Sequence, residues 1–384
     1  MGFNKASKNK QVLSYRKSDD LPDAWNVFLP EGHFLRTDQL KVTEQAALPD
    51  VSFRYILVID NDVPVAAVYF QLLALKPKHI NAEKVKAWQY SVWNAYSNVV
   101  HPKMLVAGHL FRHDVDSFYY APTLSPFEAY QYYQEAINTA LTETCANTVL
   151  VKDMSHELVT YFQNYAPQYL SLRNDISMEM DIPEEWKTMQ DYEKALKHKY
   201  AQRYRKVRNA LNGIEVKELS AAEVEQEKTN IYKLYNNVTE QQQVRLGLLN
   251  ETFIPTLKQY YKNEFKVWGM YEDGVMIGFL SAWLKGDAFD MFYIGFDYEK
   301  NNAFQLYFNI LFLSIEKAIE FNKNKLILGR TALEAKARLG CKPNYLSTYL
   351  YIRNKYIRNR VLQTQQKNFV NEGAWEERHP FKNN

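Results

Sequence analysis

The sequence predicts a mixed α/β (α+β) protein built from two similar modules, each a mixed sheet flanked by helices. A chain of 384 residues is long enough for two domains of ordinary size. With 46% hydrophobic and 24% charged residues, it has the composition of a globular protein and not of a disordered one. A series of strands and helices also occurs twice in the same order, with the two copies roughly 210 residues apart.

The first copy begins with a β-hairpin. Two apolar runs, residues 55–59 and 63–70, flank Asn61-Asp62, a dipeptide that favours hairpin turns. After the hairpin we expect a strand, a long helix, a short apolar strand, a short helix and a last strand. The clearest of these are the strand at 104–110, the helix at 126–144, the strand at 148–151 and the last strand at 168–181.

The second copy follows a boundary near Ile182-Pro183, which divides the chain into modules 1–183 and 184–384. It opens with a basic linker helix at about 188–212, in which lysines and arginines flank an apolar stripe at helical spacing. The elements expected after it are helices at 224–236 and 252–261, a hairpin at 267–280, a strand at 288–296, a helix at 302–321, and strands at 325–328 and 346–353.

The strand at 325–328 leads directly into Gly329, Arg330 and a short helix. Thr331 and Glu334 have the spacing of a capping box, and Leu339-Gly340 is typical of a helix end. This arrangement places Gly329 and Arg330 at the C-terminal edge of a sheet, where ligands of α/β proteins commonly bind. On the local pattern alone, a plain helix cap with Arg330 as an ordinary surface charge is an equal alternative.

Composition and the absence of motifs exclude several classes of function. Two cysteines are too few for a disulfide framework or for a metal site of their own, and a net charge of +3 favours no acidic partner. Residues 1–11 are polar and rich in lysine, so we expect no signal peptide, and the most apolar stretch, 306–319, contains polar residues that indicate a buried helix and not a membrane span. We therefore expect a cytoplasmic protein.

A metal site is not predicted. His109, His113, Asp114 and Asp116 are close in sequence but lack the spacing of a metal-binding motif. The sequence also contains no GxSxG elbow, no Walker loop and no GxGxxG motif, so serine hydrolase, P-loop and Rossmann functions have no support.

Several motifs in the second module, together with the order of elements, resemble a known family. They are Asp273-Gly274, Tyr293-Ile294-Gly295, the segments 306–309 and 315–319, Gly329-Arg330-Thr331-Ala332, Lys336 and Leu339-Gly340. The chain resembles the GNAT acyltransferase superfamily, in particular the tandem-GNAT branch with the FemAB-like aminoacyl transferases and the BioF2-like acetyltransferase domain. The resemblance implies two tandem GNAT-like modules and an N-acyltransferase, in which an amine attacks an acyl thioester directly, without a covalent enzyme intermediate.

The resemblance also implies where the donor binds. A GNAT module holds a thioester donor between two splayed parallel strands, with its pyrophosphate on the N-terminal amides of the helix that follows. This implies acyl-CoA between the strands at 288–296 and 325–328, with Lys300, Asn301 and Asn302 at the pyrophosphate. The glycine-rich phosphate loop of the superfamily is missing, because residues 296–302 contain no glycine and two acids. That departure matches the FemAB-like branch and counts against coenzyme A.

Direct acyl transfer needs a base for the amine, an acid for the leaving group and donors for the oxyanion. The candidates at the strand edge are Asp290, Tyr293, Tyr307 and Glu334 as catalytic residues, and Gly329, Arg330, Thr331 and Lys336 as substrate-binding residues. Arg330 is the strongest of them, as a guanidinium for an anionic donor or a carboxylate substrate. Structural roles are the alternatives, with Tyr307 in the core, Glu334 as a cap and Lys336 in solvent.

Three functions stay open at this point. The leading one is an acyl-CoA-dependent N-acyltransferase that works in the C-terminal module on a small-molecule or peptide-like amine. The second is a FemAB-like transferase that uses aminoacyl-tRNA and a cell-wall precursor. It is less favoured because the chain lacks a long helical-hairpin insertion to hold tRNA. The third is a non-catalytic binding protein with degenerate donor sites.

Overall fold

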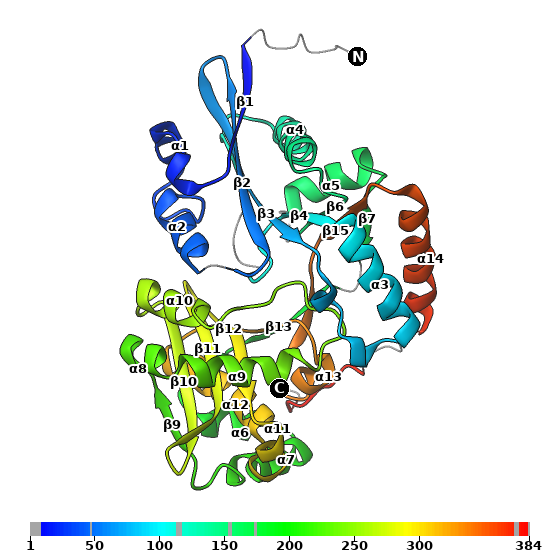
Figure 1. Cartoon of the computed structure of the whole chain (residues 1–384). Coiled ribbons are helices and arrows are strands. Elements are labelled where there is room, and N and C mark those ends of the chain that lie inside the picture. The colour runs from blue at the N-terminus through cyan, green and yellow to red at the C-terminus, as the bar shows by residue number, and fades with distance from the viewer. Residues whose placement is uncertain are drawn as a thin grey trace. The chain divides into compact units, whose positions relative to one another are not determined.

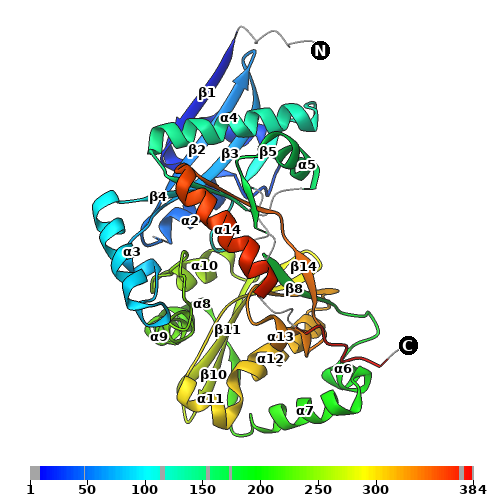
Figure 2. The same cartoon turned by 90° about the vertical axis from the view of Figure 1, so that its right-hand side faces the viewer.

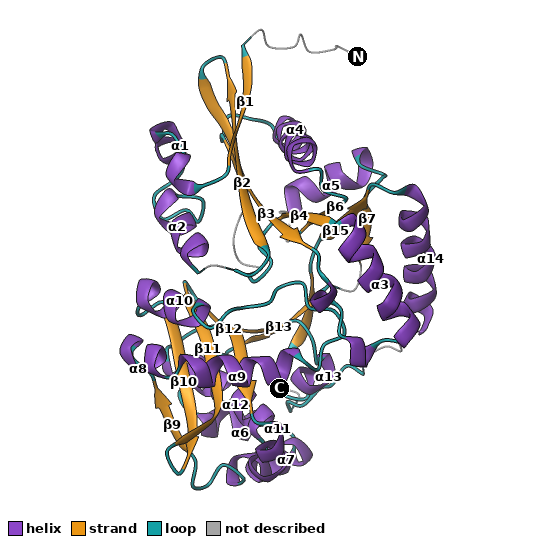
Figure 3. Ribbon diagram, viewed as in Figure 1, coloured by secondary structure: helices purple, strands orange, loops and turns teal. Residues whose placement is uncertain are grey.

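The computed structural model describes residues 9–46, 48–112, 117–152, 156–172, 175–371 and 376–382, with backbone alone for 156–157 and 364–371. The chain forms two compact units, each built around one mixed sheet (Figures 1 and 3). Unit 1 comprises Met1–Arg173, Val244–Leu249 and Leu346–Asn371, and unit 2 comprises Asn174–Gln243, Asn250–Tyr345 and Glu372–Asn384. This confirms the predicted fold class of two mixed sheets flanked by helices.

Sheet 1, the sheet of unit 1, has eight strands among the described residues. Their spatial order is β1-β2-β3-β4-β6-β15-β7, with β5 beside β3. The β4–β6 pair is parallel and the other pairs are antiparallel. The strands are β1 (Lys10–Tyr15), β2 (Val51–Asp60), β3 (Val63–Ala74), β4 (Lys103–Ala107), β5 (Phe118–Tyr120), β6 (Thr148–Val151), β7 (Leu170–Leu172) and β15 (Thr348–Ile352).

Helices cover both faces of sheet 1 because successive residues of its strands point to opposite sides. Ile56 and Val58 of β2 pack under α4 (Pro126–Thr144) and α5 (His156–Tyr165), while Tyr55 and Leu57 pack under α1 (Asp23–Phe28) and α2 (Thr37–Gln45). The remaining helical elements of unit 1 are η1 (Ser18–Asp20), η2 (Pro77–His79), η3 (Ala82–Lys84), α3 (Ala87–Val100) and α14 (Lys355–Asn371).

Sheet 2, the sheet of unit 2, has seven strands in the described part of the chain, in the order β14-β8-β13-β12-β11-β10-β9. Its one parallel pair is β12–β13. The strands are β8 (Ile176–Asp181), β9 (Glu215–Glu218), β10 (Phe265–Glu272), β11 (Val275–Lys285), β12 (Ala288–Phe296), β13 (Lys325–Gly329) and β14 (Lys342–Tyr345).

Helices also lie on both faces of sheet 2 (Figure 2). One face carries α6 (Met189–Ala195), α7 (His198–Asn209) and α12 (Leu306–Glu320), and the other carries α8 (Ala221–Gln226), α9 (Lys228–Thr239) and α10 (Phe253–Tyr261). The short helices α11 (Tyr298–Phe304) and α13 (Leu333–Ala337) follow β12 and β13. The apolar stretch at 306–319 is therefore a buried helix, α12, as predicted.

Apart from β5, the two sheets match strand by strand, but they exchange their last strands. β8 follows β7 in the sequence and lies in sheet 2 between β13 and β14, whereas β15 follows β14 and lies in sheet 1 between β6 and β7. The last strand expected at 168–181 is therefore two strands, β7 and β8, in different sheets. The strand expected at 346–353 is confirmed as β15, but it lies in sheet 1. The exchange makes each compact unit discontinuous in sequence, so the division after residue 183 stays a prediction about the repeat.

The basic linker is two helices, α6 and α7, where the sequence predicted one. Leu196 and Lys197 between them are extended, and the Lys197 N–H donates to the Pro380 carbonyl at 2.8 Å. Two of its arginines are already paired: Arg205 with Glu193 at 2.6 Å and Arg208 with Glu316 at 2.8 Å. Intramolecular ion pairs therefore neutralise part of the positive charge of this segment.

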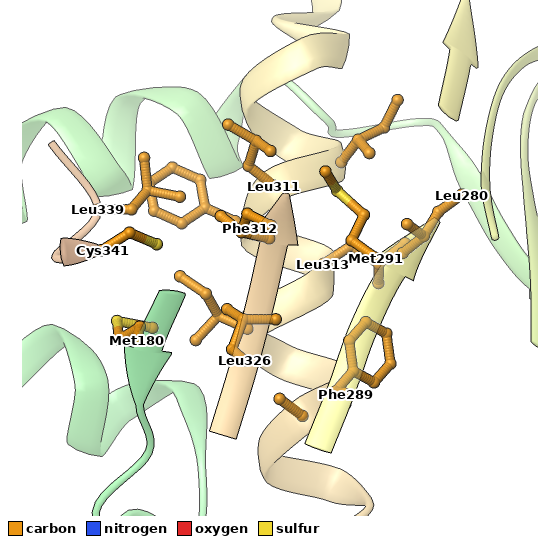
Figure 4. Packing of buried hydrophobic residues seen from close by; sticks show 14 of the residues in the cluster. Met180, Leu280, Phe289, Met291, Leu311, Phe312, Leu313, Leu326, Leu339 and Cys341 are labelled. Atoms are coloured by element: carbon orange, nitrogen blue, oxygen red, sulfur yellow. The ribbon is translucent and has the colours of Figure 1, made fainter. Parts of the chain in front are cut away.

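The core of unit 2 lies between sheet 2 and α12 (Figure 4). Phe289 and Leu326 come from the parallel strands, Leu311 comes from α12, and all three are fully buried. Each such side chain contributes about 1.5–3 kcal/mol by leaving water. Met180 of β8 packs into the same cluster, so the exchanged strand supplies part of this core.

The position of β15 inside sheet 1 predicts the effect of Leu350→Pro. Leu350 pairs with Leu150 of β6 and Leu170 of β7, and a proline there removes a ladder N–H in the middle of a sheet, at a cost of about 3 kcal/mol or more. Amide hydrogen exchange of β6 and β7, followed by mass spectrometry, should become faster by about two orders of magnitude. Val275→Pro, at the exposed first position of β11, is the control and should change little. Unchanged protection of β6 in Leu350→Pro would contradict the exchange.

Candidate functional site

The parallel strands of sheet 2 separate part-way along their length. β12 and β13 are paired over Ala288–Asp290, and β12 then continues to Phe296 without this partner. The cause is a β-bulge, since Met291 pairs with Ala282 and Ile294 with Leu280, which leaves Phe292 and Tyr293 opposite Ser281 alone. An extra residue bends a strand and increases its twist. The bulge therefore turns β12 away from β13.

Ser281 satisfies the backbone of the bulge. Its side chain is fully buried, and its Oγ accepts the Tyr293 N–H at 3.0 Å and donates to the Tyr293 carbonyl at 2.7 Å. Buried backbone groups without partners are costly. The hydroxyl replaces the ladder hydrogen bonds that the extra residue interrupts.

Unit 1 does not separate at the corresponding place. β4 and β6 are paired from Met104 to Ala107, and the Lys152 N–H extends the contact by donating to the Ala107 carbonyl at 2.8 Å. A Cβ at Gly108 would lie 2.9 Å from the Cβ of Lys152, so the segments that follow β4 and β6 remain close after the strands end. Among the described residues, the splayed pair is a feature of unit 2.

Arg330, at the end of β13, is held by a carboxylate from the first half of the chain. Its Nη2 donates to Asp175 Oδ2 at 3.2 Å, and its Nε donates to Asp175 Oδ1. Asp175 immediately precedes the exchanged strand β8. The sequence suggested either a ligand-binding guanidinium or an ordinary surface charge at the sheet edge. The structure instead places there a two-point ion pair whose Arg330 side chain is 31% exposed.

The predicted capping box does not form. α13 begins at Leu333, its N-cap is Ala332, and no side chain caps it. A capping side chain needs an extended backbone at the N-cap, whereas Thr331 and Ala332 both adopt left-handed conformations, with φ of 67° and 48°. The turn therefore exposes Thr331 and carries strain at two residues that have a Cβ.

Lys336 of α13 is a buried amine at the same strand end. It is 3% exposed, and its Nζ donates to the Gly329 carbonyl at 3.1 Å and to the Arg330 carbonyl at 2.6 Å. Among the described residues no carboxylate pairs with it. Burial lowers its pKa to about 8, with a smaller opposite effect from Cys341. A neutral amine in this position keeps both N–H donors on the carbonyls and has a free lone pair.

Two more predicted residues lie along β12. Tyr293 stands in the bulge, and its ring contacts Tyr235 of α9 at 5.4 Å. Burial and the neighbouring Tyr235 raise the pKa of Tyr293 well above its ordinary value, and the charge of Arg330 offsets this only in part, so the phenol stays protonated. Asp290 is buried at the last position where β12 is paired with β13.

Tyr307 and Glu334 have structural contacts. Tyr307 packs on Phe296 and Phe308 beside the core of unit 2, and burial raises its pKa to about 12. The Glu334 carboxylate accepts from Arg338 Nη2 at 2.6 Å and from Arg378 Nη2 at 2.9 Å, which lowers its pKa. The geometry thus places Gly329, Arg330 and Lys336 together at the end of β13, while Tyr293 stands in the bulge of β12 and Glu334 is held by its own ion pairs.

Comparison with known proteins extends this description. No protein-family model and no curated protein sequence matches the chain. Solved structures do match. FemX has a TM-score of 0.51 at 10% sequence identity, and the match covers 92% of this chain and 99% of FemX. A tandem GNAT protein from the clavulanic acid biosynthesis pathway has a TM-score of 0.50 at 8% identity, with 90% of this chain and 99% of that chain covered, and L-PGS from Bacillus licheniformis has a TM-score of 0.50 at 10% identity, with 92% and 98% covered. The chain has a tandem GNAT fold. At these identities the likeness concerns the fold alone, and it confirms the FemAB-like tandem topology predicted from the sequence.

The tandem GNAT fold implies coenzyme A, and the residues around α11 do not fit its pyrophosphate. The Asp297 carboxylate caps α11 and accepts the N–H groups of Glu299 at 2.8 Å and Lys300 at 3.4 Å. Lys300 Nζ is paired with Glu272 at 2.7 Å, and Asn301 Oδ1 accepts the Tyr307 N–H at 3.0 Å, at the start of α12. The amides and the cation that would receive a pyrophosphate already have partners.

Asn302, the third residue expected at the pyrophosphate, is exposed on α11. Its carbonyl accepts Gln305 Nε2 at 3.2 Å, at the junction between α11 and α12. Gln305 itself adopts a left-handed conformation, which separates the two helices. The helix expected to begin near residue 302 is therefore two helices.

Sequence reasoning missed Asp175 and Ser281. Asp175 lies 155 positions before Arg330 and only the strand exchange brings them together. Ser281 lies inside an apolar strand, where nothing local distinguishes a bulge partner from any small residue. Neither residue belongs to a motif, so only strand register reveals them.

The weak metal candidate is not supported by a cluster among the described residues. His113, Asp114 and Asp116 lie outside these residues. Buried His109 accepts the N–H groups of Phe111 and Arg112 on Nδ1, at 3.1 and 3.2 Å. No group of three potential ligands occurs within the described ranges.

Unit 2 also has a hollow of about 490 Å³ at the start of β13, the end opposite to Arg330. Trp186, Phe381 and Pro343 provide its apolar wall, and Lys325 and Lys342 lie among its charged residues. This hollow is separate from the strand end that carries Lys336. In the part of the chain that the structure describes, no helix has the length and apolar character needed to cross a bilayer.

Ser281→Ala should destabilise the protein by about 1–3 kcal/mol, because it leaves two buried backbone groups of the bulge without a partner. Urea unfolding measures this. Ser314→Ala is the matched control, because Ser314 is also fully buried but its hydroxyl only donates to Ile310 O within α12. Alanine favours a helix there, so the control should change stability by less than about 0.5 kcal/mol. Equal effects of the two substitutions would contradict the role of Ser281.

The pKa of Lys336 predicts a dependence of stability on pH. Its folded-state pKa is about 8 and its ordinary value is 10.5, so between these values the unfolded chain binds more protons than the folded chain. The free energy of unfolding of the wild type, relative to Lys336→Met, should therefore rise with pH by about 1 kcal/mol per pH unit between about pH 8 and pH 10.

Denaturant unfolding of both proteins across this range tests the prediction. Both keep Cys341, whose pKa is raised by burial to about 12, so that its own contribution falls at high pH. The difference between the two proteins removes most of that contribution. A difference that stays constant with pH would show that Lys336 titrates normally.

Proposed function

We propose that the protein is an N-acyltransferase that joins an activated acyl group to an amine at the splayed strands of unit 2. The observation that supports this is the separation of β12 from β13, with the Arg330–Asp175 pair and the buried amine of Lys336 at its end. We expect an extended acyl donor to lie along the part of β12 that β13 leaves unpaired. The corresponding strands of unit 1 remain paired, which favours unit 2 as the working module.

The reaction is a direct transfer. The amine nitrogen attacks the acyl carbon, its proton passes to neutral Lys336, and the bond to the leaving sulfur or oxygen then breaks. The Tyr293 phenol, which stays protonated, donates a hydrogen bond to the oxyanion. Asp290 at the point of separation and Tyr307 on α12 are further candidates for proton transfer, with Glu334 the least suited because two arginines hold it.

Arg330 gives the site its positive charge. The guanidinium, oriented by Asp175, supplies positive charge for an anionic group of the donor or for a carboxylate of the acceptor. Gly329 and exposed Thr331 border it on the same turn. We propose a small-molecule or peptide-like amine as the acceptor, in the cytoplasm.

Two donors are compatible with this chemistry. Acyl-CoA fits the thioester reaction, but the partners of Lys300 and Asn301 and the Asp297 cap leave no place on α11 for its pyrophosphate. Aminoacyl-tRNA, the second candidate, carries its acyl group on an ester and needs no pyrophosphate on that helix. The occupied helix N-termini favour it over acyl-CoA.

A transfer assay with Lys336→Met tests the proposal. Wild-type protein is incubated with acetyl-CoA, long-chain acyl-CoA or aminoacyl-tRNA and a panel of amines, and amide products are measured by mass spectrometry. Lys336→Met should lower kcat by about 100-fold or more, because a positioned base contributes that much. The kcat/KM of the wild type should rise as the pH passes about 8, when Lys336 becomes neutral.

Lys258→Met is the matched control. Lys258 is also buried, also has a lowered pKa, and donates to two backbone carbonyls, Lys262 O at 3.0 Å and Phe265 O at 3.1 Å, in the α10–β10 region. Its replacement should leave kcat within about threefold of the wild type. An equal loss in both variants would make Lys336 a structural residue. Failure of every donor to react or bind would favour a non-catalytic protein.

A further inference from the structure

Helix α3 of unit 1 carries an apolar stripe in contact with solvent. Trp88 is 65% exposed, Val92 62%, Val99 79% and Val100 46%. Positions 88, 92 and 99 share one face of a helix, since they are separated by about one and two turns. The 14 residues of α3 include no charged side chain. Soluble proteins rarely expose such a contiguous row of large apolar side chains unless the row binds a partner.

Little of the described part of the chain covers α3. The helix, cyan in Figure 2, packs mainly on the short helices η2 and η3, and Ser97 is its one buried residue. On the inner side Trp93 Nε1 donates to the Pro77 carbonyl at 3.3 Å, and the Trp93 ring contacts Tyr96 at 6.1 Å. The inner side is thus anchored by aromatic residues while the stripe faces outward.

The flanks of α3 are basic. Between residues 76 and 103 the sequence has five lysines and a single acid, Glu83. Lys76 and Lys78 are paired with Asp50. Lys84 and Lys86 are both exposed and directly precede the helix. Positive charge therefore stands next to the N-terminal end of the apolar stripe.

We propose that α3 is a membrane-surface helix that binds anionic bilayers. Its apolar stripe enters the boundary between headgroups and acyl chains, and Lys84 and Lys86 contact the anionic headgroups. Tryptophan is enriched at that boundary, and Trp88 stands in the outward stripe. A helix of 14 residues lies on a bilayer, because crossing one needs about 20.

A lipid surface fits these features better than a protein partner does. A protein interface would use the apolar stripe alone, whereas an anionic bilayer also uses the lysines that precede it. The lysines stand just before the helix, where their side chains can reach the phosphates of anionic headgroups. The proposal stands apart from the acyl-transfer site, because it depends on α3 and its flanking lysines alone.

Vesicle sedimentation of the full chain tests the proposal. The probes are phosphatidylcholine vesicles with and without phosphatidylglycerol. The wild type should bind the anionic vesicles, and Trp88→Ser/Val92→Ser/Val99→Ser should lower the partition coefficient at least about tenfold. Lys84→Gln/Lys86→Gln should lower it by about fivefold for each lysine at low salt. Brominated lipids should quench tryptophan fluorescence of the wild type and quench the triple variant less.

The matched control removes three exposed valines elsewhere, in Val27→Ser/Val63→Ser/Val275→Ser, which are 84%, 58% and 65% exposed. It should bind vesicles like the wild type. Thermal unfolding should be unchanged in all variants, because the substituted side chains pack little. Absence of wild-type binding to anionic vesicles would overturn the proposal, and so would equal binding by the α3 triple variant. A wild-type dimer that the triple variant converts to a monomer, without vesicle binding, would also overturn it and identify a self-association face.

Discussion

The bulge in β12 is the constraint on which the proposed site depends. Two residues, Phe292 and Tyr293, oppose the single residue Ser281, and the strand bends away from its parallel neighbour. A continuous ladder would keep β12 and β13 about 4.8 Å apart and close the edge to any ligand. The buried hydroxyl of Ser281 makes the interruption tolerable, because it pairs with both backbone groups of Tyr293. Without such a hydroxyl, the separation would leave polar groups unpaired inside unit 2.

The strand exchange links this site to the other half of the chain. β8 lies beside β13 and brings Met180 into the core of unit 2 and Asp175 to Arg330. A charge pair of this kind fixes the direction of a long, flexible arginine, whose side chain would otherwise lose considerable rotamer entropy on binding a ligand. Each sheet thus contains a strand encoded by the opposite half, so neither repeat can complete its own sheet.

Local sequence signals were overridden where the tertiary structure imposed a different backbone. The spacing of Thr331 and Glu334 favours a capping box. However, Thr331 and Ala332 adopt left-handed backbone conformations in which the cap cannot form, and Glu334 pairs with Arg338 and Arg378 instead. In that turn the carbonyls of Gly329 and Arg330 both accept hydrogen bonds from the buried Lys336 amine. Among the described residues, no carboxylate forms an ion pair with this amine. At the start of α11 the local signal did hold, because Asp297 caps the helix as aspartates commonly do. Its carboxylate therefore occupies the helix N-terminus, where the pyrophosphate of coenzyme A would bind.

The sequence by itself determined the elements that short-range physics controls: the two sheets, the hairpin at Asp273-Gly274, the buried helix α12, the absence of a phosphate loop, and Arg330 at a strand end. Hydrophobic periodicity and turn residues depend on a few neighbouring positions, so a single sequence is enough to detect them. Only the tertiary structure decided the exchange of β8 and β15, the bulge opposite Ser281, the Asp175 partner of Arg330 and the burial of Lys336. These depend on strand register and on contacts across more than a hundred residues, for which neighbouring residues carry no signal.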